Sequence, residues 1–178
     1  MFLMHELMNE KRYRKLRPIR DQYRFVRHYG PDDADVWSAG PVALGHRRLA
    51  IVDLSAAGHQ PMPNEDGSLR LVFNGEIYNF RELRAQLQAA GHRFRSRSDS
   101  EVIVHGYAEW GDAIVEHLRG IFAFALWDDH RRRLLLARDR LGVKPLVYRL
   151  FGSELMFASD TRALVAASGG QSEVNPDA

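Results

Sequence analysis

Apolar and polar residues alternate along this chain with two different periods, and each change of period marks where a strand or a helix is expected. From Val42 to Asp53 the pattern is that of a strand, and a second apolar run covers Leu69 to Phe73. The second run ends at Asn74-Gly75, a pair that tolerates positive φ in tight turns. The pattern therefore predicts two strands, the second of which ends in a turn.

Two helices are predicted in the middle of the chain, where apolar residues recur every three or four positions. The first begins at Asn79, which we interpret as an N-cap with Glu82 as its capping-box partner, and it stops at Gly91. The second helix begins at Asp99 or Ser100, since either side chain can cap a helix.

The rest of the chain is predicted to be mainly strands. Short connections between these strands favour antiparallel pairing, so the expected fold class is α+β with antiparallel sheets. Residues 1–29 differ, because they are basic and show no period-2 apolar run, and no core strand is predicted there. The later elements are expected at 113–118 (helix), 121–127, 134–138, 146–151 and 155–158 (strands) and 162–167 (helix).

Composition places the chain among ordinary globular proteins. It has 178 residues, 45% of them hydrophobic and 27% charged, which is enough for one domain with a substantial core. The net charge of +2 is too small to imply a polyanionic partner, and no apolar run reaches the length of a membrane span. The sequence has no cysteine, which excludes disulfides, thiolate zinc sites and thiol catalysis in the chain as given. We expect a cytoplasmic protein without membrane or nucleic-acid partners.

Three motifs follow one another in the sequence: Gly-His-Arg-Arg-Leu-Ala-Ile-Val-Asp at 45–53, Asn-Gly-Glu-Ile-Tyr-Asn at 74–79 and Ser-Asp-Ser-Glu at 98–101. Together they resemble the glutamine-hydrolysing domain of asparagine synthetases, which is a class II glutamine amidotransferase. The resemblance implies a four-layer αββα sandwich of antiparallel sheets, the fold of N-terminal-nucleophile hydrolases. The expected organisation is an atypical basic segment at 1–29, an amidotransferase-like domain at 30–168 and the start of a linker to a synthetase domain at 169–178.

A glutamine pocket must satisfy an α-carboxylate, an α-ammonium and a neutral amide. The planar fork of arginine matches a carboxylate, and the resemblance gives this role to Arg48. It gives the ammonium to Asp99, although an aspartate at the start of a helix is by itself more often an N-cap. Backbone groups around Leu49, Ile51 and Val52 are implied to line the pocket.

Attack on an amide develops negative charge on its oxygen, so hydrogen-bond donors must be in place beforehand. The resemblance assigns this oxyanion role to the Asn74 side chain and the Gly75 backbone N–H, and it places Glu76 on polar groups of the substrate beside them. Asn-Gly alone is more typical of a hairpin turn, but the Glu-Ile-Tyr-Asn that follows favours the site. Asn74 and Gly75 are therefore the expected catalytic residues.

The nucleophile of the family has no counterpart in this sequence. Family members open with Met-Cys-Gly, and removal of Met exposes a cysteine whose own α-amino group acts as base. Here Phe2 follows Met1, and Tyr29 stands where the family has arginine. We therefore expect a domain built to hydrolyse glutamine and supply ammonia for asparagine synthesis, but inactive as given and lacking the family's N-terminus. Its expected partner is an ATP-dependent synthetase domain or subunit. ATP and Mg²⁺ belong to that absent part, and no cofactor or metal is expected in this one.

Two other interpretations stay open. A non-catalytic module would keep the glutamine pocket for binding or regulation. An interaction domain would use the basic arm from Lys11 to Arg27, whose arginines and aromatic residues suit phosphates and bases, although a charge run is more often a solvated face. The chain's histidines are scattered, so no metal site is expected.

Overall fold

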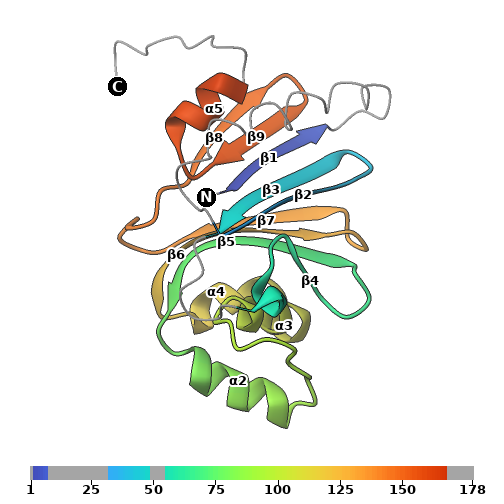
Figure 1. The fold of residues 1–178 in the computed structure, drawn as a ribbon, viewed down its shortest axis with the longest axis vertical. Helices are drawn as coiled ribbons and strands as arrows, with labels where there is room; N and C mark the ends of the chain where they lie inside the picture. Colours follow the sequence, from blue (N-terminus) through green and yellow to red (C-terminus); the bar gives the residue numbers. More distant parts are fainter. Residues whose placement is uncertain (1, 8–31, 49–54, 168–178) are drawn as a thin grey trace.

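The computed structural model describes residues 2–7, 32–48 and 55–167 of the chain. These residues form four layers, in which two antiparallel sheets lie face to face and helices cover both outer faces (Figure 1). The layers confirm the predicted α+β class and the αββα arrangement of antiparallel sheets. The order of the strands in the two sheets decides which segments of the chain lie next to one another.

The first sheet, called sheet A, has five strands and the second, sheet B, has four. In spatial order, sheet A consists of β2 (Asp33–Ala39), β3 (Val42–Arg48), β1 (Phe2–Leu7), β9 (Glu154–Ala158) and β8 (Val147–Phe151). Sheet B consists of β4 (Met62–Pro63), β5 (Leu69–Ile77), β6 (Gly120–Asp128) and β7 (Arg133–Arg138). The outer face of sheet B carries α2 (Phe80–Ala89), α3 (Glu101–Trp110) and α4 (Ile114–His117), and α5 (Thr161–Ala167) packs on sheet A. Short 3-10 turns occupy Ala56–Gly58 (η2) and Gly111–Ala113 (η3).

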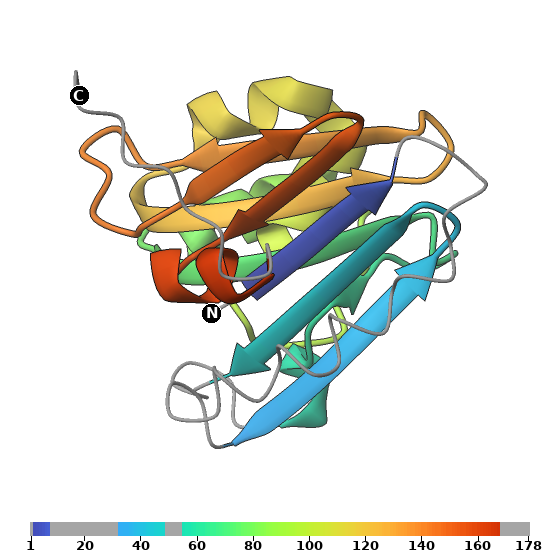
Figure 2. The same cartoon turned by 90° about the horizontal axis from the view of Figure 1, so that it is seen from above.

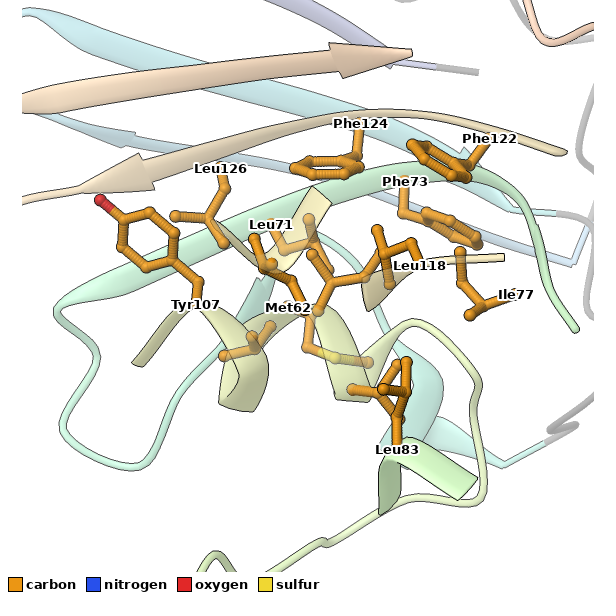
Figure 3. Packing of buried hydrophobic residues seen from close by; sticks show 14 of the residues in the cluster. Met62, Leu71, Phe73, Ile77, Leu83, Tyr107, Leu118, Phe122, Phe124 and Leu126 are labelled. Atoms are coloured by element: carbon orange, nitrogen blue, oxygen red, sulfur yellow. The ribbon is translucent and has the colours of Figure 1, made fainter. Parts of the chain in front are cut away.

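Side-chain alternation along the two long strands of sheet B divides the interior into separate cores. Phe73 and Phe124 belong to the core between sheet B and its helices, which Figure 3 shows together with Leu83 and Tyr107 from those helices. The opposite face of sheet B carries Val72, Ala123, Ala125 and Trp127, and it packs on sheet A. That second core contains Val42, Leu44, Val72, Ala123, Ala125, Trp127 and Phe157. A third, small core of Ala158, Ala163 and Leu164 holds α5 on sheet A.

The turn predicted at Asn74-Gly75 is wrong, because β5 continues through both residues to Ile77. Asn74 pairs with Ala123 and Gly75 with Phe122 in the ladder to β6. The positive φ that the Asn-Gly pair suggested is present, but in the strand, where Gly75 has φ 154°. The Asn-Gly pair therefore agrees with the positive φ at Gly75, but the chain does not reverse there.

The ends of the two central helices also differ in part from the prediction. Gly91, with φ 101°, follows the end of α2 as expected. Asn79 lies at the N-cap position of α2, but its side chain makes no capping bond. It donates instead to the His117 carbonyl at 2.9 Å and accepts from the Arg119 N–H at 2.9 Å. Ser100 stands at the N-cap of α3, again without a side-chain capping bond.

The expectation that residues 1–29 contain no core strand is wrong. Phe2–Leu7 forms β1 in the middle of sheet A, where Phe2 pairs with His46 of β3 and Leu3 with Ala158 of β9 (Figure 2). This six-residue segment lies between β3 and β9, and backbone hydrogen bonds to both strands stabilise it as a strand. Its own sequence therefore need not alternate strongly between apolar and polar residues. The edge strand β2 was likewise not predicted, and residues 8–31 and 49–54 lie outside the described part of the chain.

Candidate functional site

The strand that carries Asn74 is fixed by side chains from two other segments. Alternation along β5 puts Asn74 on the same face as Val72, which packs toward sheet A. Phe73, between them, donates its N–H to the Gln60 side-chain oxygen at 2.7 Å. The Phe73 carbonyl lies 3.0 Å from Nε2 of His46 on β3. The backbone on one side of Asn74 is therefore tied both to sheet A and to the segment before β4.

His46 serves this purpose as a neutral side chain. It is buried, and the loss of solvation on burial is the main reason why its pKa lies well below the usual value. A carbonyl oxygen only accepts hydrogen bonds, so Nε2 carries the hydrogen that is donated to Phe73. His46 belongs to the motif at 45–53, but no local sequence pattern predicts its bond to a carbonyl 27 positions away.

Gly75 is required by its conformation and by its surroundings. Its φ of 154° lies in a region that residues with a side chain rarely adopt. A Cβ at this position would meet the Ile121 carbonyl oxygen at 2.2 Å and the Phe122 Cα at 2.7 Å. Both contacts are with backbone that cannot move aside cheaply. The close approach of β5 and β6 therefore depends on glycine at this position.

Arg48 ends β3, and its guanidinium is buried against the η2 turn. One nitrogen donates to the Ser55 carbonyl at 3.1 Å. A Cβ on Gly58 would lie 2.2 Å from another nitrogen, so the guanidinium rests on the bare backbone of that glycine. Arg48 thus has a defined place next to the segment that leads to Gln60 and, through Gln60, to Phe73.

The η2 turn is anchored to the edge of sheet A by His59. Its two ring nitrogens lie 2.7 Å from a carboxylate oxygen of Asp33 and 3.1 Å from one of Asp35, both on β2. Burial lowers the pKa of His59, but the hydrogen bonds with Asp35 and Asp33 outweigh it and raise the pKa above its usual value. The turn that supports Arg48 is therefore held by two charge-assisted contacts.

Asp99 occupies a buried position beside the end of β5. One of its oxygens accepts the Ile77 N–H at 2.8 Å, and Ile77 follows Asn74-Gly75-Glu76 directly. Burial raises the pKa of Asp99 above the usual value, backbone hydrogen bonds from Ile77 oppose this, and the nearby charge of Glu76 adds to the rise. Since this carboxylate bonds to β5, the interpretation of Asp99 as a mere helix cap is wrong.

The structure places part of the predicted site on one strand. Asn74, Gly75 and Glu76 lie in β5, and Asp99 bonds to Ile77 at the end of that strand. Arg48 lies at the end of β3 against the η2 turn, and His46 of the same strand bonds to the Phe73 carbonyl of β5. A cavity of about 430 Å³ is lined by residues of α4, the start of β6 and the loop after β7, and none of the predicted site residues is part of its lining. Leu49, Ile51 and Val52 lie outside the described residues, so their predicted place in the pocket is untested.

Two further findings concern what the described residues do not contain. No group of three or more histidine or acidic side chains there is arranged to hold a metal ion. In the same ranges, no helix has the length and hydropathy needed to cross a membrane. The expectation that the domain needs no metal or cofactor stays a prediction.

Comparison with known proteins shows which family the chain resembles. A glutamine-hydrolyzing asparagine synthetase of Bacillus subtilis, number 3, is 48% identical over 139 residues, which are 77% of this chain and 22% of that protein. Its number 2 counterpart is 45% identical over 139 residues, 78% of this chain and 18% of that protein. The amidase chry2 of Gibberella zeae is 41% identical over 143 residues, which are 79% of this chain and 21% of that protein. The chain thus spans about a fifth of the length of these relatives.

A solved structure of similar fold is that of the glutamine phosphoribosylpyrophosphate amidotransferase of B. subtilis complexed with ADP and GMP, with a TM-score of 0.76. At 21% identity, over 94% of this chain and 44% of that one, this likeness concerns the fold alone. The family model described as a glutamine amidotransferase domain matches residues 4–178, a range that includes most of β1. The chain therefore belongs to the glutamine amidotransferase domain family, and its similarity to glutamine-hydrolysing asparagine synthetases extends over more than three quarters of its length.

Proposed function

We propose that this chain is the glutamine-binding amidotransferase domain of an asparagine synthetase-like protein. One observation carries the proposal above all: a buried carboxylate, Asp99, accepts the N–H of Ile77 at 2.8 Å, directly after Asn74-Gly75-Glu76. A buried acceptor beside a set of oxyanion donors is what recognition of a zwitterionic amide requires.

Asp99 has acceptor capacity left for the α-ammonium of glutamine. One oxygen accepts the Ile77 N–H and the other has the Ser98 hydroxyl at a long 3.5 Å, while the backbone N–H groups of Asp99 and Ser100 also stabilise the carboxylate. Burial raises the pKa of Asp99, so its ionised form is poorly solvated in the free protein. An ammonium brings three donors and an opposite charge, and it would relieve this cost. Glutamate and glutamine share the ammonium, so their distinction falls to the amide end of the pocket.

The α-carboxylate of the substrate is assigned to Arg48. Its planar guanidinium can pair with a carboxylate through two parallel hydrogen bonds, which lysine cannot do. Support for this role comes from the burial of Arg48 and from the contact of its guanidinium with Gly58, where a side chain would displace it. Backbone groups of Leu49, Ile51 and Val52, which follow Arg48 in the sequence, complete the proposed pocket.

The amide is assigned to Asn74 and Gly75, with Glu76 beside them. Asn74 presents its side chain on the face toward sheet A, and Gly75 follows in the same strand. Such donors lower the barrier only when a nucleophile attacks, and the sequence as given has no cysteine. We therefore propose that this amidotransferase domain, as given, binds glutamine without hydrolysing it. The second candidate function is a module that uses the same pocket for binding or regulation alone.

The wider role is inferred from the relatives, whose names describe glutamine-hydrolysing asparagine synthetases. In that setting the ammonia would be used for asparagine synthesis by an ATP-dependent synthetase domain or subunit, with residues 169–178 leading toward it. We assign the amidotransferase unit to residues 30–168, with β1 as an additional strand of its sheet. A cytoplasmic location and the lack of a cofactor in this unit stay predictions.

The test is calorimetry on the full chain with glutamine, glutamate and asparagine. Glutamine should bind most tightly, and Arg48→Lys and Asp99→Asn should each weaken it by about tenfold, the effect of losing one charge-assisted hydrogen bond. Glutamate release from glutamine should stay at background. Equal affinity for the three amino acids, unchanged in both variants, would exclude the glutamine pocket, and glutamate release above background would exclude the proposed inactivity.

A further inference from the structure

The segment from His92 to Ser98 connects α2 to Asp99 and has no regular secondary structure. Yet Ser96, Ser98 and Asp99 are buried. A buried backbone without a helix or strand must have its N–H and C=O groups bonded by side chains or water. The partners that this segment finds decide how firmly the Asp99 carboxylate is held.

Arg84, in the middle of α2, bonds two carbonyls of the segment. One guanidinium nitrogen donates to the Ser96 carbonyl at 2.8 Å and another to the Ser98 carbonyl at 3.1 Å. The guanidinium also lies over the Phe94 ring, 4.4 Å from its centre, and this contact helps to fix its orientation. A fork that spans two carbonyls is a property of arginine, because lysine offers a single ammonium point.

Glu101 bonds the N–H groups of the same segment from the opposite side. Its carboxylate accepts the Arg95 N–H at 2.7 Å, the Ser96 N–H at 2.8 Å and the Ser96 hydroxyl at 2.6 Å. Burial opposes ionisation of Glu101, but hydrogen bonds with His105, Arg95 and Ser96 outweigh it and hold the pKa at about 2. Arg84 thus donates to carbonyl groups, and Glu101 accepts from N–H groups, of the short segment immediately before Asp99.

From this geometry we infer that Arg84 is a positioning residue for glutamine recognition. By bonding the Ser96 and Ser98 carbonyls it fixes the backbone that carries Asp99, and it keeps the Asp99 carboxylate against the Ile77 N–H, where it can accept from the substrate's ammonium. Arg84 itself contacts no substrate atom. The inference rests on the proposed function, since it takes Asp99 as the ammonium ligand.

The experiment compares two ligands, because a residue that acts through Asp99 must affect only the ligand that Asp99 binds. Glutamine carries the α-ammonium, while glutaramate is glutamine without its α-amino group. The full chain is titrated with each by calorimetry as wild type, Arg84→Gln, Arg84→Lys and Asp99→Asn. The matched control is Arg81→Gln on the same helix, where the exposed Arg81 has its guanidinium 5.7 Å from the Phe80 ring.

Arg84→Gln is expected to weaken glutamine binding about tenfold and glutaramate binding less than about twofold, since a charge-assisted contact is loosened for glutamine only. Arg84→Lys, which can bond one of the two carbonyls, should fall between Arg84→Gln and wild type. Arg81→Gln should leave both affinities unchanged. Amide hydrogen exchange at Ile77 should become faster in Arg84→Gln, because its acceptor is no longer held in place.

Equal weakening of both ligands in the Arg84 variants would show a general structural role and overturn the inference. Unchanged glutamine affinity in Arg84→Gln would overturn it as well. If Arg84→Gln does not fold, the ratio of the two affinities in Arg84→Lys decides in the same way. A wild type that binds glutamine no better than glutaramate, or an Asp99→Asn change without effect on glutamine, would refute the proposed function itself and the role of Arg84 with it.

Discussion

The two sheets of the sandwich are assembled in opposite ways. Sheet B comes from one continuous stretch between Met62 and Arg138, with its helices inserted between β5 and β6. Sheet A combines strands from the beginning, the first third and the end of the described chain, and its central strand β1 pairs with β9 near the opposite end of the sequence. One sheet is thus set by neighbouring sequence and the other by contacts that form only when distant segments meet.

The site draws on both sheets. Sheet B provides Asn74 and Gly75, with Asp99 bonded to the end of the same strand. Sheet A provides Arg48 at the end of β3, and His46, which bonds to the Phe73 carbonyl across the two sheets. The difference teaches that the oxyanion half of the pocket can persist when sheet A is disturbed, whereas the carboxylate half depends on the strands that hold β3.

The largest effect is expected for His5→Pro in β1. This residue pairs with Ala43 on one side and Met156 on the other, so a proline breaks a ladder in the middle of sheet A. We expect a loss of about 3–5 kcal/mol in the free energy of unfolding, the upper part of the range for single substitutions. Hydrogen exchange should show lost protection in β3 and β9 while β5 and β6 keep theirs. His5→Ala, which retains the N–H, is the control, and equal loss in both sheets would contradict the comparison.

Gly75→Ala should have the next largest effect, and it acts on sheet B. The added Cβ meets backbone of β6 at 2.2 Å and requires a positive φ from a residue with a side chain. A destabilisation of about 2–3 kcal/mol is expected from overpacking and strain. Urea unfolding measures it, and a variant as stable as wild type would show that β5 and β6 can separate without cost.

Gly58→Ala makes the same chemical change beside Arg48, with a different expected outcome. Here the new Cβ meets the end of a flexible side chain, 2.2 Å from a guanidinium nitrogen, and not backbone. Stability should fall by less than in Gly75→Ala, because a flexible side chain can move where backbone cannot, while glutamine affinity falls about tenfold because the guanidinium moves. Calorimetry and urea unfolding on the same sample separate the two effects. Unchanged affinity would argue against Arg48 as the carboxylate ligand.

Sequence patterns predicted sheet B and its helices better than sheet A, because sheet B comes from one continuous stretch of the chain and sheet A from distant segments. The helix α2 buries one face, and β5 and β6 contain continuous apolar runs buried on both faces, and a local sequence pattern records both features. The strand β1 was missed because its partners are His46 and Ala158, which belong to segments far from it in sequence. Motifs located Arg48, Asn74, Gly75 and Asp99, but no local pattern reports the long-range bonds of His46, Gln60 or Arg84.

Phe2→Cys tests whether the position of β1 brings a nucleophile to the site. Residue 2 pairs with His46, and His46 bonds to the carbonyl of the residue before Asn74. Once Met1 is removed from the Phe2→Cys variant, the new thiol and the free amine would enter the site on the central strand, and weak glutamate release should appear. Phe2→Ser, which introduces a far weaker nucleophile, is the control. A cysteine variant that stays inert would show that this register leaves residue 2 out of reach of Asn74.

The smallest expected effect concerns two buried carboxylates with opposite pKa shifts. Asp99 has a raised pKa, caused mainly by burial. Burial also opposes ionisation of Asp139, but its hydrogen bonds with the N–H groups of Lys144, Val143 and Phe122 outweigh it and lower the pKa. In the proposed function Asp99 binds the ammonium of glutamine, whereas Asp139 accepts hydrogen bonds from backbone N–H groups of the protein itself.

Linkage fixes the sign of each stability change. A raised pKa means that Asp99 favours the folded state at low pH, and this stability is lost as the pH rises through the raised value. Asp99→Asn should therefore stabilise the chain at pH 7, and the gain should disappear in acid, below the usual carboxyl pKa. The lowered pKa of Asp139 contributes stability above the usual value, which is lost as the pH falls through the lowered one, so Asp139→Asn should destabilise at pH 7 and do less harm in acid. Urea unfolding of both variants at neutral and acidic pH decides. If Asp99→Asn destabilised the chain at pH 7 as Asp139→Asn does, the Asp99 carboxylate would be a structural anchor of β5, and its place as a ligand for the ammonium of glutamine would have to be given up.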